Sequence, residues 1–153
     1  MDRLRITLIH KEAAWQLRHE VMWPERELDY VKLEDDDAGA HYGLFEGEQM
    51  ISVVSLFIDG SEAQFRKFAT LESMQGKGYG SKLLHHVLNE AASSGVKRVY
   101  CNARSHKASF YQKFGLAVTD RTFTKGGKDY VIMELYFDAS GERERNGVEQ
   151  IND

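Results

Sequence analysis

The sequence predicts an α+β domain with a central mixed, mostly antiparallel sheet of six to seven strands, flanked by about four helices. Three observations lead to this prediction. Apolar and polar residues alternate in several short segments, apolar residues at helical spacing follow positions 11 and 82, and glycine-containing turns separate neighbouring strand segments. The predicted order is a strand, a helical region, three strands, a helix, a strand, a helix and two strands.

The first half of the chain opens with a strand whose alternate apolar residues, from Leu4 to Leu8, are expected on the buried face. The helix that follows is ended by Pro24, the single proline of the chain. Residues 25–38 are rich in charge, and we interpret residues 34–37 (Glu-Asp-Asp-Asp) as a solvated loop. The predicted elements of this half are a strand at 4–9, a helix at 11–22, a hairpin of strands at 42–46 and 50–58, and a strand at 63–71.

In the second half, Gly95 and Gly115 are placed to end two helices, and residues 125–128 form a hairpin turn. We expect one domain over residues 1–137 and a polar tail over residues 138–153. Contact with a second subunit is one way in which such a tail would be held in place. The predicted elements of this half are a helix at 82–94, a strand at 96–103, a short helix at 107–114, and strands at 117–124 and 129–137.

Composition narrows the class of protein. With 153 residues, 42% of them hydrophobic and 29% charged, the chain has the size and composition of one globular domain. Its formal net charge of −4 argues against a nucleic-acid partner. No apolar run approaches the roughly 18 residues that cross a membrane, and residues 1–4 begin no signal peptide. Cys101 is the single cysteine, so a cytoplasmic location is expected, and the scattered histidines predict no metal site.

The segment Gln75–Ser81 (Gln-Gly-Lys-Gly-Tyr-Gly-Ser) is the most informative motif. It contains three glycines and leads directly into the predicted helix. A glycine-rich turn at the start of a helix exposes backbone N–H groups and the positive end of the helix dipole, which together favour an anion. The alternative interpretation of such a cluster is a flexible surface turn.

Two nucleotide-binding motifs do not fit this segment. The phosphate loop of nucleotide triphosphatases needs four residues between its first glycine and a closing Gly-Lys-Ser/Thr, whereas Lys77 lies between glycines. The dinucleotide fingerprint needs a third glycine where Ser81 stands, and it belongs to a first βαβ unit. A nucleotide-binding domain is therefore disfavoured.

The pattern that fits is Gln-x-x-Gly-x-Gly at Gln75, Gly78 and Gly80, and here the chain resembles the GNAT family of N-acetyltransferases. Residues 110–116 (Phe-Tyr-Gln-Lys-Phe-Gly-Leu) are similar to a second block of that family, and residues 130–135 to its closing strand. The resemblance spans about residues 63–135. It implies a GNAT-like fold and an acyltransferase that uses acetyl-CoA as co-substrate, without a metal.

In that family the strand before the loop hydrogen-bonds the pantetheine arm of the coenzyme, and the loop amides hold its diphosphate. The family commonly carries Asn at the position of Arg104, so the resemblance leaves open whether Arg104 or Asn102 contacts CoA. The coenzyme-binding residues that the resemblance implies are Phe68, Ala69, Thr70, Gln75, Gly76, Lys77, Gly78, Tyr79, Gly80, Ser81, Asn102 and Tyr111.

The resemblance also places Tyr111 beside the coenzyme sulfur, where a tyrosine suits the protonation of a departing thiolate, because its ordinary pKa of about 10 keeps it protonated at neutral pH. Tyr111 is therefore the expected general acid, and the alternative is a core aromatic residue beside Phe110 and Phe114. Glu62, Glu72 and Glu134 are local carboxylates, but no general base is assigned.

The expected reaction is direct transfer of an acetyl group from acetyl-CoA to a primary amine of a small molecule or protein. The acceptor pocket is expected at residues 15–40 and 120–130, where the sequence does not identify the amine. Dimers are common among similar proteins, so a homodimer is one expectation. A non-catalytic acyl-CoA-binding sensor is the alternative function.

Overall fold

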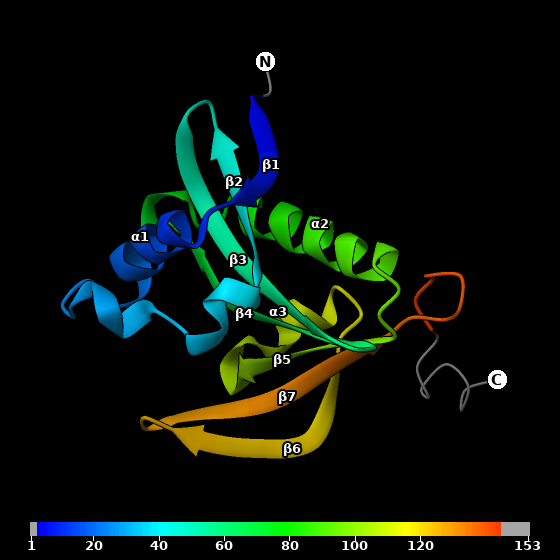
Figure 1. Ribbon diagram of the computed structural model, residues 1–153. Helices are drawn as coiled ribbons and strands as arrows, with labels where there is room; N and C mark the ends of the chain where they lie inside the picture. Colours follow the sequence, from blue (N-terminus) through cyan, green and yellow to red (C-terminus); the bar gives the residue numbers. More distant parts are fainter. Residues whose placement is uncertain (1–2, 145–153) are drawn as a thin grey trace. The chain divides into compact units, whose positions relative to one another are not determined.

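The computed structural model describes residues 3–144, and the chain divides into two compact units. The first unit comprises Met1–Phe57 and Phe65–Asn89, and the second comprises Ile58–Gln64 and Glu90–Asp153. Figure 1 labels the strands and the α-helices. In chain order the strands and helices are β1 (Leu4–Ile9), α1 (Lys11–Met22), η1 (Leu28–Val31), η2 (Glu34–Ala38), β2 (Ala40–Glu46), β3 (Gln49–Asp59), β4 (Glu62–Thr70), η3 (Glu72–Met74), α2 (Tyr79–Ser93), β5 (Arg98–Arg104), η4 (Ser105–Lys107), α3 (Ala108–Gln112), β6 (Ala117–Lys125) and β7 (Lys128–Tyr136).

The seven strands hydrogen-bond in the order β1-β2-β3-β4-β5-β7-β6. The pairs β1–β2, β2–β3, β5–β7 and β6–β7 are antiparallel. Strands β4 and β5 pair in parallel through residues 62–64 and 98–100. The mixed, mostly antiparallel sheet is therefore confirmed. Among residues 3–144 there are three α-helices and four short 3-10 helices, against about four helices expected.

In the first unit, α1 and α2 pack on opposite faces of the strands. Val53 of β3 belongs to a buried cluster with Leu17 of α1. Tyr42, which pairs with Val54, contacts His86 of α2 with ring centroids 5.7 Å apart. Because consecutive residues of a strand point to opposite faces, each helix has its own face of β3.

Two expectations for the first unit are corrected by the structure. Leu8 is 63% exposed, because β1 is the end strand of the sheet order, and the next residue, Ile9, packs against the Leu17 cluster instead. The interpretation of residues 34–37 as a solvated loop is wrong at Asp36. This residue lies in η2 and is only 3% exposed, because a buried arginine of α1 binds its carboxylate.

In the second unit, the prediction that Gly115 closes the third helix is confirmed. Gly115 has φ +94°, and its N–H donates to the Gln112 carbonyl, while the Leu116 N–H reaches back to the Tyr111 carbonyl. This pair of hydrogen bonds is a Schellman motif, which satisfies carbonyls that a helix end leaves open. Leu116, the residue after the glycine, is buried, and the turn fixes the end of the helix that carries Tyr111.

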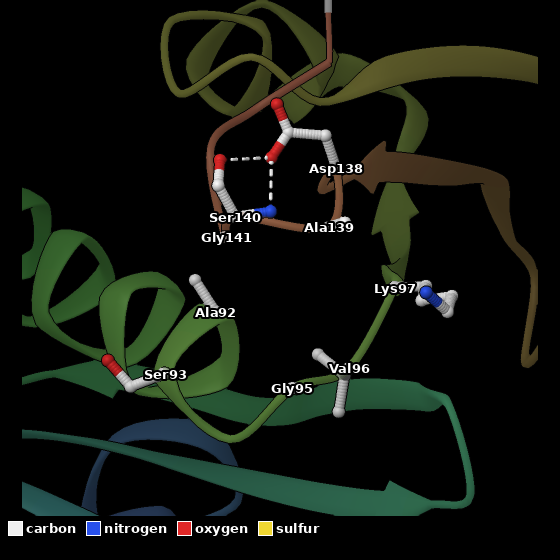
Figure 2. Close-up of a pocket in the computed structure, with 9 residues that line it drawn as sticks. All are labelled: Ala92, Ser93, Gly95, Val96, Lys97, Asp138, Ala139, Ser140 and Gly141. Atoms are coloured by element: carbon white, nitrogen blue, oxygen red, sulfur yellow. Dashed lines mark hydrogen bonds between the residues drawn. The ribbon is translucent and has the colours of Figure 1, made fainter.

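Residues 138–144 of the predicted tail fold back on their own unit. The Asp138 carboxylate accepts hydrogen bonds from the N–H and hydroxyl of Ser140, as Figure 2 shows. Arg143 donates to the Phe114 carbonyl at 2.5 Å. A hollow of about 300 Å³ lies between this return and residues 92–97. The chain itself therefore holds residues 138–144, whereas the rest of the predicted tail, residues 145–153, lies outside the described residues.

No helix within residues 3–144 is both long and apolar enough to cross a membrane. Over the same residues, no group of three or more His, Cys, Asp or Glu side chains is arranged to hold a metal ion.

Candidate functional site

The glycine-rich loop and the start of α2 form the first part of the candidate site, within the first unit. Helix α2 begins at Tyr79, three residues earlier than expected, and the Lys82 N–H makes a helical hydrogen bond to the Gly78 carbonyl at 3.1 Å. The amides of Gly80 and Ser81 therefore precede the hydrogen-bond ladder of the helix, which is where a helix offers donors to an anion. No acidic side chain lies in the first turn of α2, so no carboxylate of that turn competes for these donors.

Two of the three loop glycines are required by backbone conformation. Gly76 and Gly78 have φ angles of +78° and +87°, a region that side-chain-bearing residues rarely adopt. A Cβ atom at either position would have no neighbour within 4 Å, so space is not the constraint there. The two left-handed residues shape the loop before the helix begins.

Gly80 is required for a different reason, the close approach of helix and strand. It lies inside α2, and a Cβ atom there would be 3.1 Å from Cζ of Phe68 and 3.3 Å from Oγ1 of Thr70. The first turn of α2 therefore rests directly on the end of β4. This contact brings the two coenzyme-binding segments implied by the resemblance, residues 68–70 and residues 75–81, together in one unit.

The end of β4 has an unusual backbone. Lys67 is the only non-glycine residue within 3–144 with a positive φ, at +59°. Such a conformation costs of order 1–3 kcal/mol and persists where the surrounding structure imposes it, often at functional sites. It lies directly before Phe68. The sequence does not predict the positive φ of Lys67, because a lysine at this place is compatible with an ordinary strand.

Tyr111, the expected general acid, lies on α3 in the second unit. Its side chain is half-buried, and its ring contacts Phe110 edge-on with centroids 5.2 Å apart. Burial raises the pKa of Tyr111 above its ordinary value, and a smaller contribution comes from the nearby Cys101. A raised pKa keeps the phenol protonated at neutral pH, which is the state that a general acid requires.

Cys101 is a buried residue of β5 and is 3% exposed. Burial raises the pKa of its thiol to about 12. Since the thiolate is the nucleophilic form, this cysteine is inert at neutral pH and acts as a small apolar residue. An acyl-carrying role for Cys101 is therefore disfavoured.

Asn102 and Arg104 lie on one face of β5, and Cys101 and Ala103 lie on the other. The Asn102 side chain is exposed, and that of Arg104 is half-buried.

Two of the three carboxylates considered as bases are held in ion pairs. Arg98 donates from Nε to Glu134 at 2.8 Å and contacts Glu62 through Nη1 at 3.3 Å. Both carboxylates are therefore engaged by the same guanidinium. The third, Glu72, is exposed in η3.

The aromatic and histidine side chains of residues 15–41 have structural contacts. The Trp15 indole donates to Asp36 at 2.8 Å, the His19 ring bonds the Arg26 carbonyl at 2.6 Å, and Trp23 packs edge-on against Tyr30. These contacts attach the segment between α1 and β2 to helix α1, and the segment forms an ordered layer of the first unit.

The main feature that sequence reasoning missed is a buried ion pair at the centre of this layer. Arg18 is 0% exposed, and its two terminal nitrogens bind the two carboxylate oxygens of Asp36 at 2.9 and 3.0 Å. The same guanidinium donates to the Val31 carbonyl and to Ser55, both at 2.9 Å. The pair therefore ties α1, η1, η2 and β3 together. One feature of the sequence could have indicated this ion pair: Arg18 stands four positions after Ala14, on the apolar stripe of α1.

Hydrogen bonds hold Asp36 in its charged form. Burial is the largest single influence and raises the pKa of this carboxyl. Hydrogen bonds from Arg18, the Leu33 N–H and Trp15, together with the charge of Arg18, outweigh burial and lower the pKa to about 2. His41, 4% exposed, extends the network, with Nδ1 2.6 Å from the Ser55 hydroxyl and Nε2 2.9 Å from the Asp36 carbonyl. His41 thus has a packing role.

Comparisons with known proteins show to which family the chain is similar in sequence and in fold. Residues 9–116 match the Acetyltransferase (GNAT) family. A relative from Bacillus subtilis (strain 168), the uncharacterized N-acetyltransferase YitI, is 32% identical over 121 residues, which cover 73% of this chain and 81% of the relative. A Bacillus subtilis acetyltransferase solved in complex with CoA is 22% identical with a TM-score of 0.71, over 88% of this chain and 99% of that one. A GNAT family acetyltransferase from Elizabethkingia anophelis with acetyl-CoA bound is 18% identical with a TM-score of 0.71, over 90% and 100%.

The fold and the sequence matches define the chain as an acyltransferase. It belongs to the Acetyltransferase (GNAT) family.

Proposed function

We propose that this protein is an acetyl-CoA-dependent N-acetyltransferase that moves an acetyl group to a primary amine of a small molecule or protein. The observation that carries the proposal is the left-handed pair Gly76 and Gly78 directly before the first turn of α2. This turn presents successive backbone donors at the positive end of a 15-residue helix, which suits the diphosphate of CoA. The CoA and acetyl-CoA in the related structures support the same ligand.

In the proposed reaction the neutral amine attacks the thioester carbonyl carbon and forms a C–N bond. The tetrahedral intermediate then breaks its C–S bond, and the departing thiolate takes a proton from the Tyr111 hydroxyl. The amine proton leaves to solvent, and the tyrosinate regains a proton from solvent before the next turnover. Burial of Tyr111 supports this role, because it keeps the phenol protonated until the thiolate forms.

The proposal is tested by two measurements on the purified full-length chain. Titration calorimetry with CoA and acetyl-CoA is expected to give 1:1 binding, and a thiol-release assay with a panel of primary amines is expected to give turnover with at least one of them. Binding without thiol release from any amine would favour the acyl-CoA sensor instead. No binding of either coenzyme would refute both functions.

Gly78→Ala provides a direct test of the loop. Alanine at φ +87° is strained by roughly 1–2 kcal/mol, so the loop is expected to shift and weaken CoA binding about tenfold. Gly47→Ala is the matched control, because Gly47 also has a positive φ, +61°, with nothing within 4 Å of its Cβ position. Both variants should lower the urea midpoint of unfolding. Equal CoA affinity in the two variants would show that Gly78 has no role in binding.

A further inference from the structure

A buried serine lies beneath the candidate coenzyme loop, and no role has been assigned to it. Ser52, in β3, is 0% exposed. Its hydroxyl oxygen is 2.9 Å from the Ala69 carbonyl and 2.8 Å from Oγ1 of Thr70. A single side chain therefore contacts the last two residues of β4, which precede η3 and the glycine-rich loop.

The direction of these hydrogen bonds follows from the atoms. A carbonyl oxygen only accepts, so the single hydroxyl hydrogen of Ser52 is donated to Ala69. The bond between Ser52 and Thr70 then requires the Thr70 hydroxyl as donor. The Thr70 proton is thus directed into the protein, and its oxygen has no hydrogen left to donate to a phosphate.

Thr70 is in turn the residue on which the loop rests. Its carbonyl accepts a hydrogen bond from the Gln75 side-chain amide at 2.9 Å. Its Oγ1 lies 3.3 Å from the position that a Cβ of Gly80 would occupy, against the first turn of α2. Both the beginning of the loop and the start of the helix are therefore in contact with one threonine, whose hydroxyl Ser52 orients.

We propose that Ser52 is a positioning residue for coenzyme binding, which fixes Thr70 and through it the loop that holds the diphosphate of CoA. The inference rests on the proposed function, because it concerns the same loop. Ser52 is fully buried and does not contact the ligand, so its effect is on the placement of the loop amides. Loss of its hydroxyl removes the acceptor for Thr70 and the donor to Ala69 at once.

The test is a double-mutant cycle on ligand affinity in the full-length chain. The probes are CoA and 3′-phospho-ADP, the nucleotide half of CoA that carries the diphosphate. Ser52→Ala and Thr70→Val are each expected to weaken binding of both probes about five- to tenfold. For Ser52→Ala, whose side chain is buried away from the ligand, kcat at saturating acetyl-CoA should stay within about twofold of wild type, so the loss is expected in KM and not in kcat. The double variant should lose about as much as either single variant, because both changes break one chain of hydrogen bonds. Thr70→Ser keeps the hydroxyl and should retain affinity.

Ser55→Ala is the matched control. Ser55 is also 0% exposed on β3, but its hydroxyl bonds Arg18 and His41 in the network of α1. This variant should lower the melting temperature and leave the affinity for both probes unchanged. The inference is overturned if Ser52→Ala keeps full affinity, if the two single losses multiply in the double variant, or if Ser55→Ala weakens binding equally. Absence of CoA binding to wild type is a separate result, which refutes the proposed function itself.

Discussion

Replacement of Tyr111 by phenylalanine is expected to lower kcat by about 10²–10⁴, while the dissociation constant for CoA stays nearly unchanged. The variant keeps the ring that packs against Phe110 but removes the one proton that the proposed mechanism delivers to the thiolate. Thiol release under saturating acetyl-CoA, measured beside calorimetric titration with CoA, separates the two effects. Full activity in the variant would reject Tyr111 as the general acid.

Tyr100→Phe is the matched control for this substitution. Tyr100 is half-buried in β5 of the same unit, and its hydroxyl contacts Gln64 at 3.4 Å. Its loss should leave kcat within about twofold of wild type. The pH dependence gives a second check, because a raised pKa means that Tyr111 is still protonated at pH 9. In wild type, loss of the Tyr111 proton should therefore cause no decline in kcat for thiol release between pH 7 and pH 9.

Asp36→Asn is expected to destabilise the folded state by about 3–5 kcal/mol, a large share of a typical stability of 5–15 kcal/mol. The substitution leaves the Arg18 guanidinium buried without a negative partner. Urea unfolding followed by circular dichroism should show a much lower midpoint. Asp35→Asn is the control, since Asp35 makes a surface ion pair with Arg66 at 3.7 Å, worth at most about 1 kcal/mol. Equal urea midpoints for Asp36→Asn and Asp35→Asn would show that the buried ion pair does not stabilise the fold.

The same ion pair predicts a stability profile in acid. The carboxyl of Asp36 has a pKa of about 2 in the folded state, against an ordinary value of 3.8. A depressed pKa contributes stability that is fully present above the unfolded value and is lost as pH falls through the folded value. About 2 kcal/mol should therefore disappear between pH 5 and pH 2 in wild type. Asp36→Asn should lack this component, which unfolding curves at several pH values measure.

Much of the fold could be predicted from the sequence, because glycine, proline and apolar periodicity mark its elements. Pro24 and Gly115 end helices as expected. The start of α2 was placed three residues late, since Gly80 favours a loop on propensity alone. Only the contact with Phe68 and Thr70 explains a glycine inside the helix, and that contact joins residues ten or more positions apart.

A local motif marks one part of the candidate site, whereas contacts between distant residues leave no local mark. Within that motif, Gly76 and Gly78 have positive φ angles, a conformation that favours glycine. Asp36 is one of four consecutive acidic residues, and nothing local distinguishes it from its exposed neighbours. Ser52 likewise lies in an apolar strand without any pattern of its own. In both cases the partner, Arg18 or Thr70, is 18 positions away.

The anchoring of the segment between α1 and β2 has a practical consequence for engineering. Arg18 binds this segment at two internal points, the Val31 carbonyl and the Asp36 carboxylate. A combinatorial library that varies the exposed positions 25–27, 29 and 34–35 while retaining Arg18, Val31 and Asp36 would alter the exterior of this layer and keep these hydrogen bonds.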